Sequence, residues 1–177
     1  MYKFHKQKLP LGSENFLSIL EGIEGGFAIF TGIIVGLSFG LADRDLLLIT
    51  GVIGIVVNAF NSSAVRYSSE HYLDELDGHE TKQPVHAYLV PAVVEFLSYA
   101  LVSGVVILPL LFVHPLKLAV ATCVVLTLAV LFAAGFYRGT LLMRKHRLRD
   151  AIELSMLGGL IIFVGGLSGW LLGLLVA

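Results

Sequence analysis

Residues 20–42 read LEGIEGGFAIFTGIIVGLSFGLA, and residues 46–67 read LLLITGVIGIVVNAFNSSAVRY. Each apolar run has about the 20 residues that a helix needs to cross the hydrocarbon core of a bilayer. Acidic and amide side chains interrupt both runs, and such groups are expensive in lipid unless they face protein or water. The two stretches therefore predict a pair of membrane-spanning helices that line a path for ions.

The composition of the whole chain is that of a membrane protein. Of its 177 residues, 56% are hydrophobic and 14% are charged, whereas soluble domains carry about 25% charged residues. The net charge of −1 gives no electrostatic reason to expect a nucleic-acid partner. The single cysteine, Cys123, lies in an apolar run and is expected to be a buried, unreactive thiol.

Apolar segments of about 20 residues or more recur along the chain. They cover residues 20–42, 46–67, 85–112, 117–137 and 151–176. Since backbone polar groups in lipid must bond within their own segment, helices are the expected form. The sequence therefore predicts an all-α, polytopic membrane protein with five transmembrane helices. Residues 1–19 are expected to form a cytoplasmic N-terminal segment, and 20–177 the transmembrane domain.

Lysine and arginine are distributed unevenly between the two sides of this predicted topology. One side has Arg44 and Lys117 alone. The other side holds the remaining ten of the 12: Lys3, Lys6, Lys8, Arg66, Lys82, Arg138, Arg144, Lys145, Arg147 and Arg149. Because basic residues concentrate in cytoplasmic loops, the N-terminus is expected inside and the C-terminus outside. The membrane is expected to be a prokaryotic cell membrane.

Small residues at four-residue spacing let helix backbones approach one another in lipid. The first segment carries Gly22, Gly26, Gly32, Gly36 and Gly40, and the last carries Gly158, Gly159, Gly165, Gly166 and Gly169. Both faces are expected to pack against protein, either inside one chain or across a two-fold dimer seam. In the third segment, Pro91 and Pro109 predict kinks or a local loss of backbone hydrogen bonds.

Three acidic residues in the apolar segments are candidate ligands for a cation. Glu21 and Glu24 are one turn apart near the start of the first segment. Acids at a helix start are also explained by the helix dipole alone. Glu95 lies roughly 16 Å into the third segment, at 1.5 Å per residue, where a charge must face the bundle interior or water. Glu95 is a candidate proton relay or metal ligand, with a protonated, hydrogen-bonded carboxyl as the alternative.

The second segment carries three polar side chains on one helical face, namely Asn58, Asn61 and Ser62. Amide and hydroxyl oxygens can coordinate a partly hydrated cation. The same groups are also ordinary interhelical contacts, each worth about 0.6 kcal/mol in membranes. Both interpretations remain open at this point.

The stretch 68–84, SSEHYLDELDGHETKQP, is the only strongly acidic region and is expected to form a short cytoplasmic link. If the preceding helix continues, Glu70, Asp74 and Asp77 share one face. Carboxylates with imidazole suit divalent cations such as iron(II) or manganese(II). Glu70, His71 and Asp74 are therefore candidates for a cation-capture site, and a solvated loop is the alternative.

Four stretches taken in order resemble the vacuolar iron transporter family. EGIEGGFAIFTGIIVGLSFG (21–40) is similar to the first helix of that family, and GVIGIVVNAFNSSAVRYSSEHY (51–72) to the second helix and its exit. QPVHAYLVPAVVEFLSYALVSGVVILPLLF (83–112) resembles the third helix. The segment 135–173, above all LRDAIELSMLGGL (148–160), resembles the passage from the fourth helix to the fifth.

The resemblance implies a homodimeric transporter that moves iron(II) or manganese(II) out of the cytosol in exchange for protons, with the ion path at the dimer interface. The pore acid of the family's first helix matches Glu24, and Glu21 matches the acid before it. The second-helix acid and the pore methionine fall on Gly54 and near Ser62, so neither ligand is present. The long cytoplasmic metal-binding helices of the family are also absent between the second and third segments.

The residues predict an ion path with Glu24 as principal ligand and Asn58, Asn61 and Ser62 opposite it, and the resemblance implies that the cation is exchanged for protons. A membrane scaffold or accessory protein that kept the fold and lost the ion site is the alternative, because the pore methionine and second-helix acid are missing. The sequence has no nucleophile–base arrangement, phosphate loop or nucleotide fingerprint, so neither an enzyme nor a bound cofactor is expected.

Overall fold

A computed structural model describes residues 13–40, 43–78, 85–141 and 146–176. Its long helices are α1 (Ser13–Gly40), α2 (Arg44–Leu76), α3 (Val90–Phe112), α4 (Leu116–Leu141) and α5 (Arg147–Val176). A short π-helical turn, η1 (Val85–Leu89), leads into α3. Five spans, including η1 with α3 as one, are long and apolar enough to cross a membrane. The prediction of five membrane-spanning helices in an all-α chain is thus confirmed.

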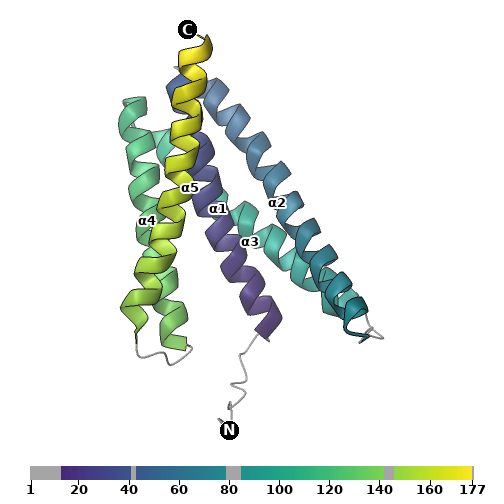
Figure 1. Cartoon of the computed structure of the whole chain (residues 1–177). Coiled ribbons are helices and arrows are strands. Elements are labelled where there is room, and N and C mark those ends of the chain that lie inside the picture. Colours follow the sequence, from purple (N-terminus) through teal and green to yellow (C-terminus); the bar gives the residue numbers. More distant parts are fainter. Residues whose placement is uncertain (1–12, 41–42, 79–84, 142–145, 177) are drawn as a thin grey trace.

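Helix α1 is the central element of the bundle. It contacts each of α2, α3, α4 and α5, while α4 packs on α5 and α2 packs on α3. In Figure 1, α2 leans away from α5, so that part of α1 is visible between them. The start of α1 and the end of α5 lie at opposite ends of the bundle (Figure 1). Beside α1, a cleft toward α2 and α3 and a groove toward α5 remain open.

The beginning of α2 is fixed by two charged side chains. The Asp43 carboxylate accepts a hydrogen bond from the backbone N–H of Asp45 at 2.8 Å, which caps the helix. The Arg44 guanidinium donates to the carbonyls of Leu110 and Val113 at 2.9 and 2.7 Å. Since the last carbonyls of a helix lack intrahelical donors, Arg44 ties the start of α2 to the end of α3.

The end of α2 lies further along the chain than the apolar pattern indicated. The helix continues beyond residue 67 to Leu76 and ends before Gly78, whose φ of +67° suits a residue without Cβ. Much of the acidic stretch expected to be a link is therefore the last turns of α2. Residues 79–84 of that stretch lie outside the described part of the chain.

The departure from α-helical geometry that Pro91 predicts is present at the start of the third span. Pro91 has no N–H to donate back to the preceding turn, and the turn η1 immediately before α3 is π-helical rather than α-helical. Pro109 lies inside α3, and its carbonyl accepts the backbone N–H of Val113 at 2.9 Å. Helix α3 continues through Pro109 to Phe112.

The glycines of α1 make close contacts inside the chain. A Cβ on Gly22 would lie 2.7 Å from the Cβ of Ser98, and one on Gly26 would lie 2.9 Å from the carbonyl oxygen of Tyr99, both in α3. Further along, Gly36 faces the backbone of Gly165 in α5. Gly22, Gly26 and Gly36 therefore serve helix packing inside the chain, and a dimer seam along the glycine faces stays a prediction.

Small polar groups join the helices at the buried centre of the bundle. The hydroxyls of Thr31 and Thr127 lie 2.6 Å apart and link α1 to α4. Ser103 donates to the carbonyl of Gly26 at 3.1 Å. Cys123 is buried and its thiol contacts the carbonyl of Val106 at 3.2 Å, as expected for an inert cysteine. Such contacts favour one arrangement of helices in lipid, where apolar burial alone gives little preference.

Replacing Gly36 by Ala should destabilise the bundle, because the new Cβ would lie 2.6 Å from the carbonyl oxygen of Gly165. Overpacking of this kind costs about 1–3 kcal/mol. Gly104→Ala is the matched control, since nothing lies within 4 Å of the added Cβ, and it should be neutral or stabilising. Thermal unfolding in detergent would measure both, and equal midpoints would contradict the close α1–α5 contact.

Candidate functional site

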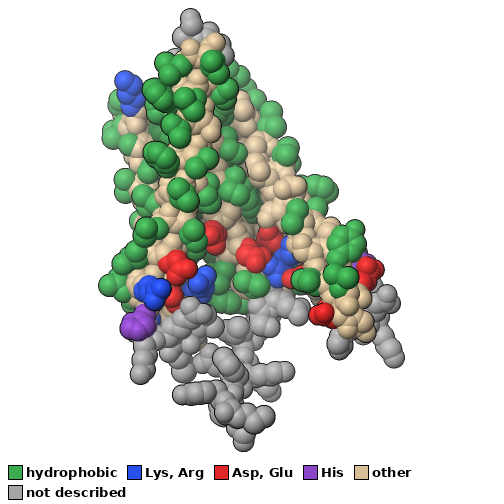
Figure 2. Space-filling view, in the orientation of Figure 1, with side chains coloured by type: hydrophobic (Ala, Val, Ile, Leu, Met, Phe, Trp, Pro, Cys, Tyr) green, Lys and Arg blue, Asp and Glu red, His purple; other side chains and the backbone are tan. Residues whose placement is uncertain are grey.

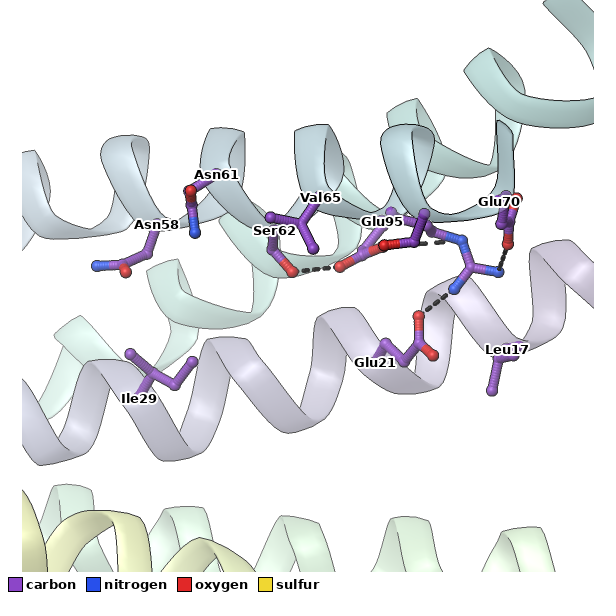
Figure 3. A pocket seen from close by; sticks show the side chains of 11 residues that line it. Leu17, Glu21, Ile29, Asn58, Asn61, Ser62, Val65, Glu70 and Glu95 are labelled. Atoms are coloured by element: carbon purple, nitrogen blue, oxygen red, sulfur yellow. Dashed lines mark hydrogen bonds and ion pairs between the residues drawn. The ribbon is translucent and has the colours of Figure 1, made fainter. Parts of the chain in front are cut away.

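A cleft of about 500 Å³ opens between α1, α2 and α3. Figure 3 shows Asn58, Asn61 and Ser62 pointing from α2 toward α1. Besides these three residues, the lining consists of Leu17, Glu21, Ile29, Val65, Arg66, Ser69, Glu70 and Glu95. The cleft is therefore polar along α2 and apolar at Leu17, Ile29 and Val65.

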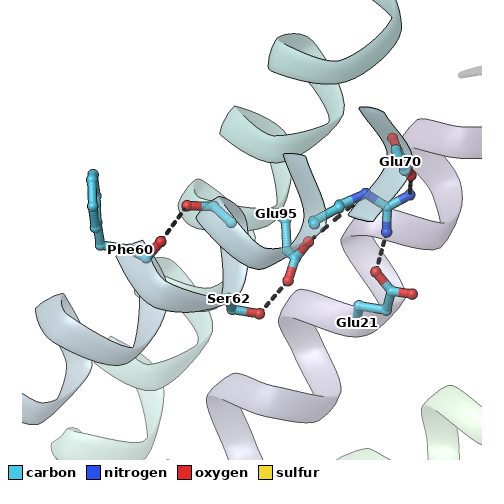
Figure 4. A network of polar contacts seen from close by, with 7 residues as sticks. Glu21, Phe60, Ser62, Glu70 and Glu95 are labelled. Atoms are coloured by element: carbon cyan, nitrogen blue, oxygen red, sulfur yellow. Dashed lines mark hydrogen bonds and ion pairs between the residues drawn. The ribbon is translucent and has the colours of Figure 1, made fainter. Parts of the chain in front are cut away.

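The guanidinium of Arg66 is the centre of the polar part of this cleft. Its Nη1 contacts the Glu21 carboxylate of α1, and its Nη2 lies 2.6 Å from Oε1 of Glu70 one turn further along α2. Its Nε lies 3.8 Å from Oε2 of Glu95 in α3. The Arg66 side chain is only 6% exposed. Figure 4 shows these contacts, through which three helices meet at one positive charge.

Glu95 is held from a second side by Ser62. The Ser62 hydroxyl donates to Oε1 of Glu95, while Oε2 faces Arg66 (Figures 3 and 4). The Glu95 side chain is 3% exposed, so it lies in the bundle interior as its depth in the sequence predicts. A Cβ on Gly22, the residue after Glu21, would lie 3.0 Å from the carbonyl oxygen of Glu95. This small residue allows α1 to come close enough for Glu21 to reach Arg66.

The site as a whole is negative and rich in oxygen. Three carboxylates surround one guanidinium, which leaves a formal charge of −2 when all are ionised. Carboxylate, amide and hydroxyl oxygens are the ligands that hard divalent cations prefer. Within the described residues, no three His, Cys, Asp or Glu side chains are grouped as a metal site. The carboxylates converge on Arg66 instead of on a common empty point.

Six of the nine residues proposed as ligands from the sequence meet in this cleft. They are Glu21, Asn58, Asn61, Ser62, Glu70 and Glu95. The amide of Asn58 also donates to the carbonyl of Gly54 at 2.9 Å within α2. Asn61 is exposed at the rim of the cleft. Side chains from three helices, far apart in the sequence, therefore form one polar surface.

Glu24, the predicted principal ligand, lies outside this cleft. The cleft wall opposite Asn58, Asn61 and Ser62 carries Glu21, and Glu24 is not part of its lining. Glu24 is half-buried, and the positive charge acting on it is that of Arg138 in α4. Side chains three residues apart on a helix differ in direction by about 300°, which is about 60° short of a full turn. Glu21 and Glu24 therefore face different neighbours. Whether Glu24 binds a cation stays a prediction.

The residues of the expected cation-capture site, Glu70, His71 and Asp74, contact different partners. Glu70 joins Arg66, whereas the Asp74 carboxylate accepts a hydrogen bond from the hydroxyl of Tyr88 in η1 at 2.7 Å. The His71 ring packs edge-on against the Tyr88 ring at 5.1 Å, and its Nε2 lies 3.2 Å from Glu75. His71 and Asp74 thus help to hold η1 against α2, and they do not line the cleft.

The residue that sequence reasoning did not identify as central is Arg66. In the sequence it ends the apolar run, which is the position of a basic residue at the start of a loop. Its spacing of four residues from Glu70 was the available signal, since such pairs contact each other on a helix. Figure 2 shows that charged side chains gather near one end of the visible face, while the rest of that face is mostly hydrophobic.

No family model matches the chain, and a search of curated proteins finds no match. The fold places the chain among multi-pass helical membrane proteins, with five candidate spans. Its candidate functional site is the cleft in which Arg66 meets Glu21, Glu70 and Glu95.

Replacing Arg66 by Gln should lower the unfolding midpoint in detergent far more than replacing Glu21 by Gln. Without Arg66, the 3% exposed Glu95 loses its counter-charge, and breaking a buried pair in this way costs about 3–5 kcal/mol. The Glu21 side chain is 44% exposed, so solvent screening leaves its ion pair worth about 1 kcal/mol or less. Scanning fluorimetry of both variants would show the difference, and equal losses would argue against a buried charge cluster.

Proposed function

We propose that this protein transports divalent transition-metal cations, iron(II) or manganese(II), out of the cytosol in exchange for protons. The observation that carries the proposal is the cleft between membrane-spanning helices in which three carboxylates, two amides and two hydroxyls meet. Acidic residues inside membrane spans mark ion and proton pathways more often than structural sites. The resemblance of the sequence to vacuolar iron transporters agrees with this chemistry.

The chemistry of the cleft suits exchange of a cation for protons. Carboxylate oxygens bind a divalent cation when ionised, and each carboxylate can hold a proton once the cation has left. The surrounding oxygens of Asn58, Asn61 and Ser62 can replace part of the hydration shell of the ion. We assign the cation-binding role to Glu21 and Glu95, and we keep Glu24 as a candidate on the α4 side of α1.

We further propose that the protein acts as a homodimer whose copies meet across the open face of α1 and α2. Asn61 is exposed at membrane depth, and Glu21 is 44% exposed. Polar groups turned toward acyl chains are unfavourable, whereas a second copy would cover both. An apolar groove of about 630 Å³ between α1 and α5 shares Ile29 with the cleft and extends this face toward Gly173.

The proposed orientation has the N-terminal end of the bundle in the cytosol. Arg138, Arg147 and Arg149 lie near helix ends on that side of the predicted topology, in agreement with the positive-inside rule. The charged cleft then opens near the cytosolic surface, where a cation leaving the cytosol would first meet it. A prokaryotic cell membrane is the proposed location.

A second candidate function is supported by one observation, the occupation of the carboxylate cluster by Arg66. Carboxylates that pair with an arginine of the same chain would also suit a non-transporting scaffold or accessory subunit. Such a protein would use the same contacts to fix α1, α2 and α3. Flux measurements separate the two functions.

Glu21→Gln should reduce uptake of Mn²⁺ into proteoliposomes at least tenfold, because a neutral amide attracts a divalent ion far less than a carboxylate does. Glu153→Gln is the matched control, since Glu153 is exposed on α5 outside the cleft. Fluorescence quenching of a trapped dye by Mn²⁺ provides the measurement. Glu24→Gln in the same assay decides which acid of α1 acts, and absence of flux in the unsubstituted protein would favour the scaffold.

The dimer can be tested by oxidative cross-linking of single cysteines. Asn61→Cys should yield a disulfide-linked dimer in membranes, because the two copies would present this rim position to each other across a two-fold axis. Phe163→Cys is the control, as Phe163 is 64% exposed on α5, away from the cleft. Non-reducing gels measure the products. Equal cross-linking of the two variants, or none for Asn61→Cys, would contradict the proposed interface.

A further inference from the structure

Arg66 occupies the position that a bound cation would need. Its three nitrogen atoms each face a different carboxylate: Nη1 faces Glu21, Nη2 faces Glu70 and Nε faces Glu95. A guanidinium is planar and holds its donors in a fixed fork, so the three acids are arranged around that plane. A divalent cation that bound all three carboxylates would have to take the place of the guanidinium.

The contacts of Arg66 differ in how easily they can be broken. Glu95 is 3% exposed and is held additionally by Ser62, and Glu70 belongs to the same helix as Arg66 at 28% exposure. Glu21 is 44% exposed and belongs to α1. An ion that enters from the open cleft therefore meets the Arg66–Glu21 contact first. Among the three Arg66 contacts, this is the one that joins α2 to α1.

We propose that Arg66 is a tethered competitor of the transported ion, which offsets part of the carboxylate charge when no metal is bound and is displaced from Glu21 when a divalent cation enters. This inference rests on the proposed function and adds a residue that determines affinity and specificity. A competing internal charge weakens the binding of every cation. A monovalent ion carries no more charge than the guanidinium it must replace, whereas a divalent ion carries twice as much.

Displacement also links ion binding to the arrangement of the helices. In the ion-free protein, Arg66 joins α1, α2 and α3 through charge-assisted contacts, which are stronger than neutral ones. Release of Glu21 removes the Arg66 contact between α1 and α2 while Glu70 keeps the guanidinium beside its own helix. Movement of the Arg66 side chain thus couples ion binding to the position of the α1 face that lines the cleft.

Titration of the full chain in detergent with MnCl₂, followed by isothermal calorimetry, tests the competition. Arg66→Lys keeps the positive charge, but a point-like ammonium cannot hold three carboxylates in the planar fork. In Arg66→Lys the entering Mn²⁺ has one strong charged hydrogen bond fewer to displace. Mn²⁺ should therefore bind this variant about tenfold more tightly than the unsubstituted protein. Arg44→Lys is the matched control, since Arg44 bonds only carbonyls of α3 among its described contacts, and it should leave Mn²⁺ affinity unchanged.

Unchanged or weaker Mn²⁺ binding by Arg66→Lys would overturn the inference, because Arg66 would then not compete with the ion. An Mn²⁺-soaked crystal of the unsubstituted protein gives a second test that does not depend on the folding of a variant. An anomalous peak between Glu21 and Glu95 with the guanidinium turned away from Glu21 supports displacement. A peak elsewhere, no peak, or a peak beside an unbroken Arg66–Glu21 contact refutes it.

The two proposals can fail separately in these experiments. Tighter Mn²⁺ binding by Arg66→Lys without flux in any proteoliposome would retain the competition and remove the transport function. Flux that depends on Glu21, together with Mn²⁺ affinity that is unchanged in Arg66→Lys, would retain transport and remove the competition.

Discussion

A guanidinium that is 6% exposed inside a bundle of membrane helices needs counter-charges from its own protein, and this requirement governs the structure around Arg66. Charge-assisted contacts in a low-dielectric interior are strong, and an unpaired buried charge is prohibitively unfavourable. The carboxylates come from α1, α2 and α3, so these three helices must meet at one level. Gly22 makes this meeting possible, because a side chain there would collide with α3.

The rest of the bundle can be understood from how α1 is packed. Helices in lipid gain little from burying apolar surface, so close backbone contact and interhelical hydrogen bonds select the arrangement. Glycines bring α1 against α3 on one side and α5 on another, and the Thr31–Thr127 contact joins it to α4. Helix α2 meets α1 at Gly51, which lies against Phe30 and Ile34, and again at the Arg66–Glu21 contact. A cleft and an adjoining apolar groove beside α1 remain open to a neighbour.

Part of the site could be predicted from the sequence, for a physical reason. Asn58, Asn61 and Ser62 share a helical face by spacing alone, and the cost of a charge in hydrocarbon indicates that Glu95 must point inward. The choice between Glu21 and Glu24 could not be made, because both lie near the start of the same apolar run. The rotation of α1 about its axis decides which acid faces α2, and contacts with α3 and α5 set that rotation.

What the sequence by itself determined is the number of spans, their helical form and the presence of buried acids, because hydrocarbon thickness and backbone hydrogen bonding impose these on any chain of this composition. Only the tertiary structure decided that Arg66 is the hub of Glu21, Glu70 and Glu95, and that His71 and Asp74 turn to Tyr88 instead. Those contacts depend on the angles and rotations of α1, α2 and α3 relative to one another, which side-chain packing fixes and which spacing along one helix does not encode.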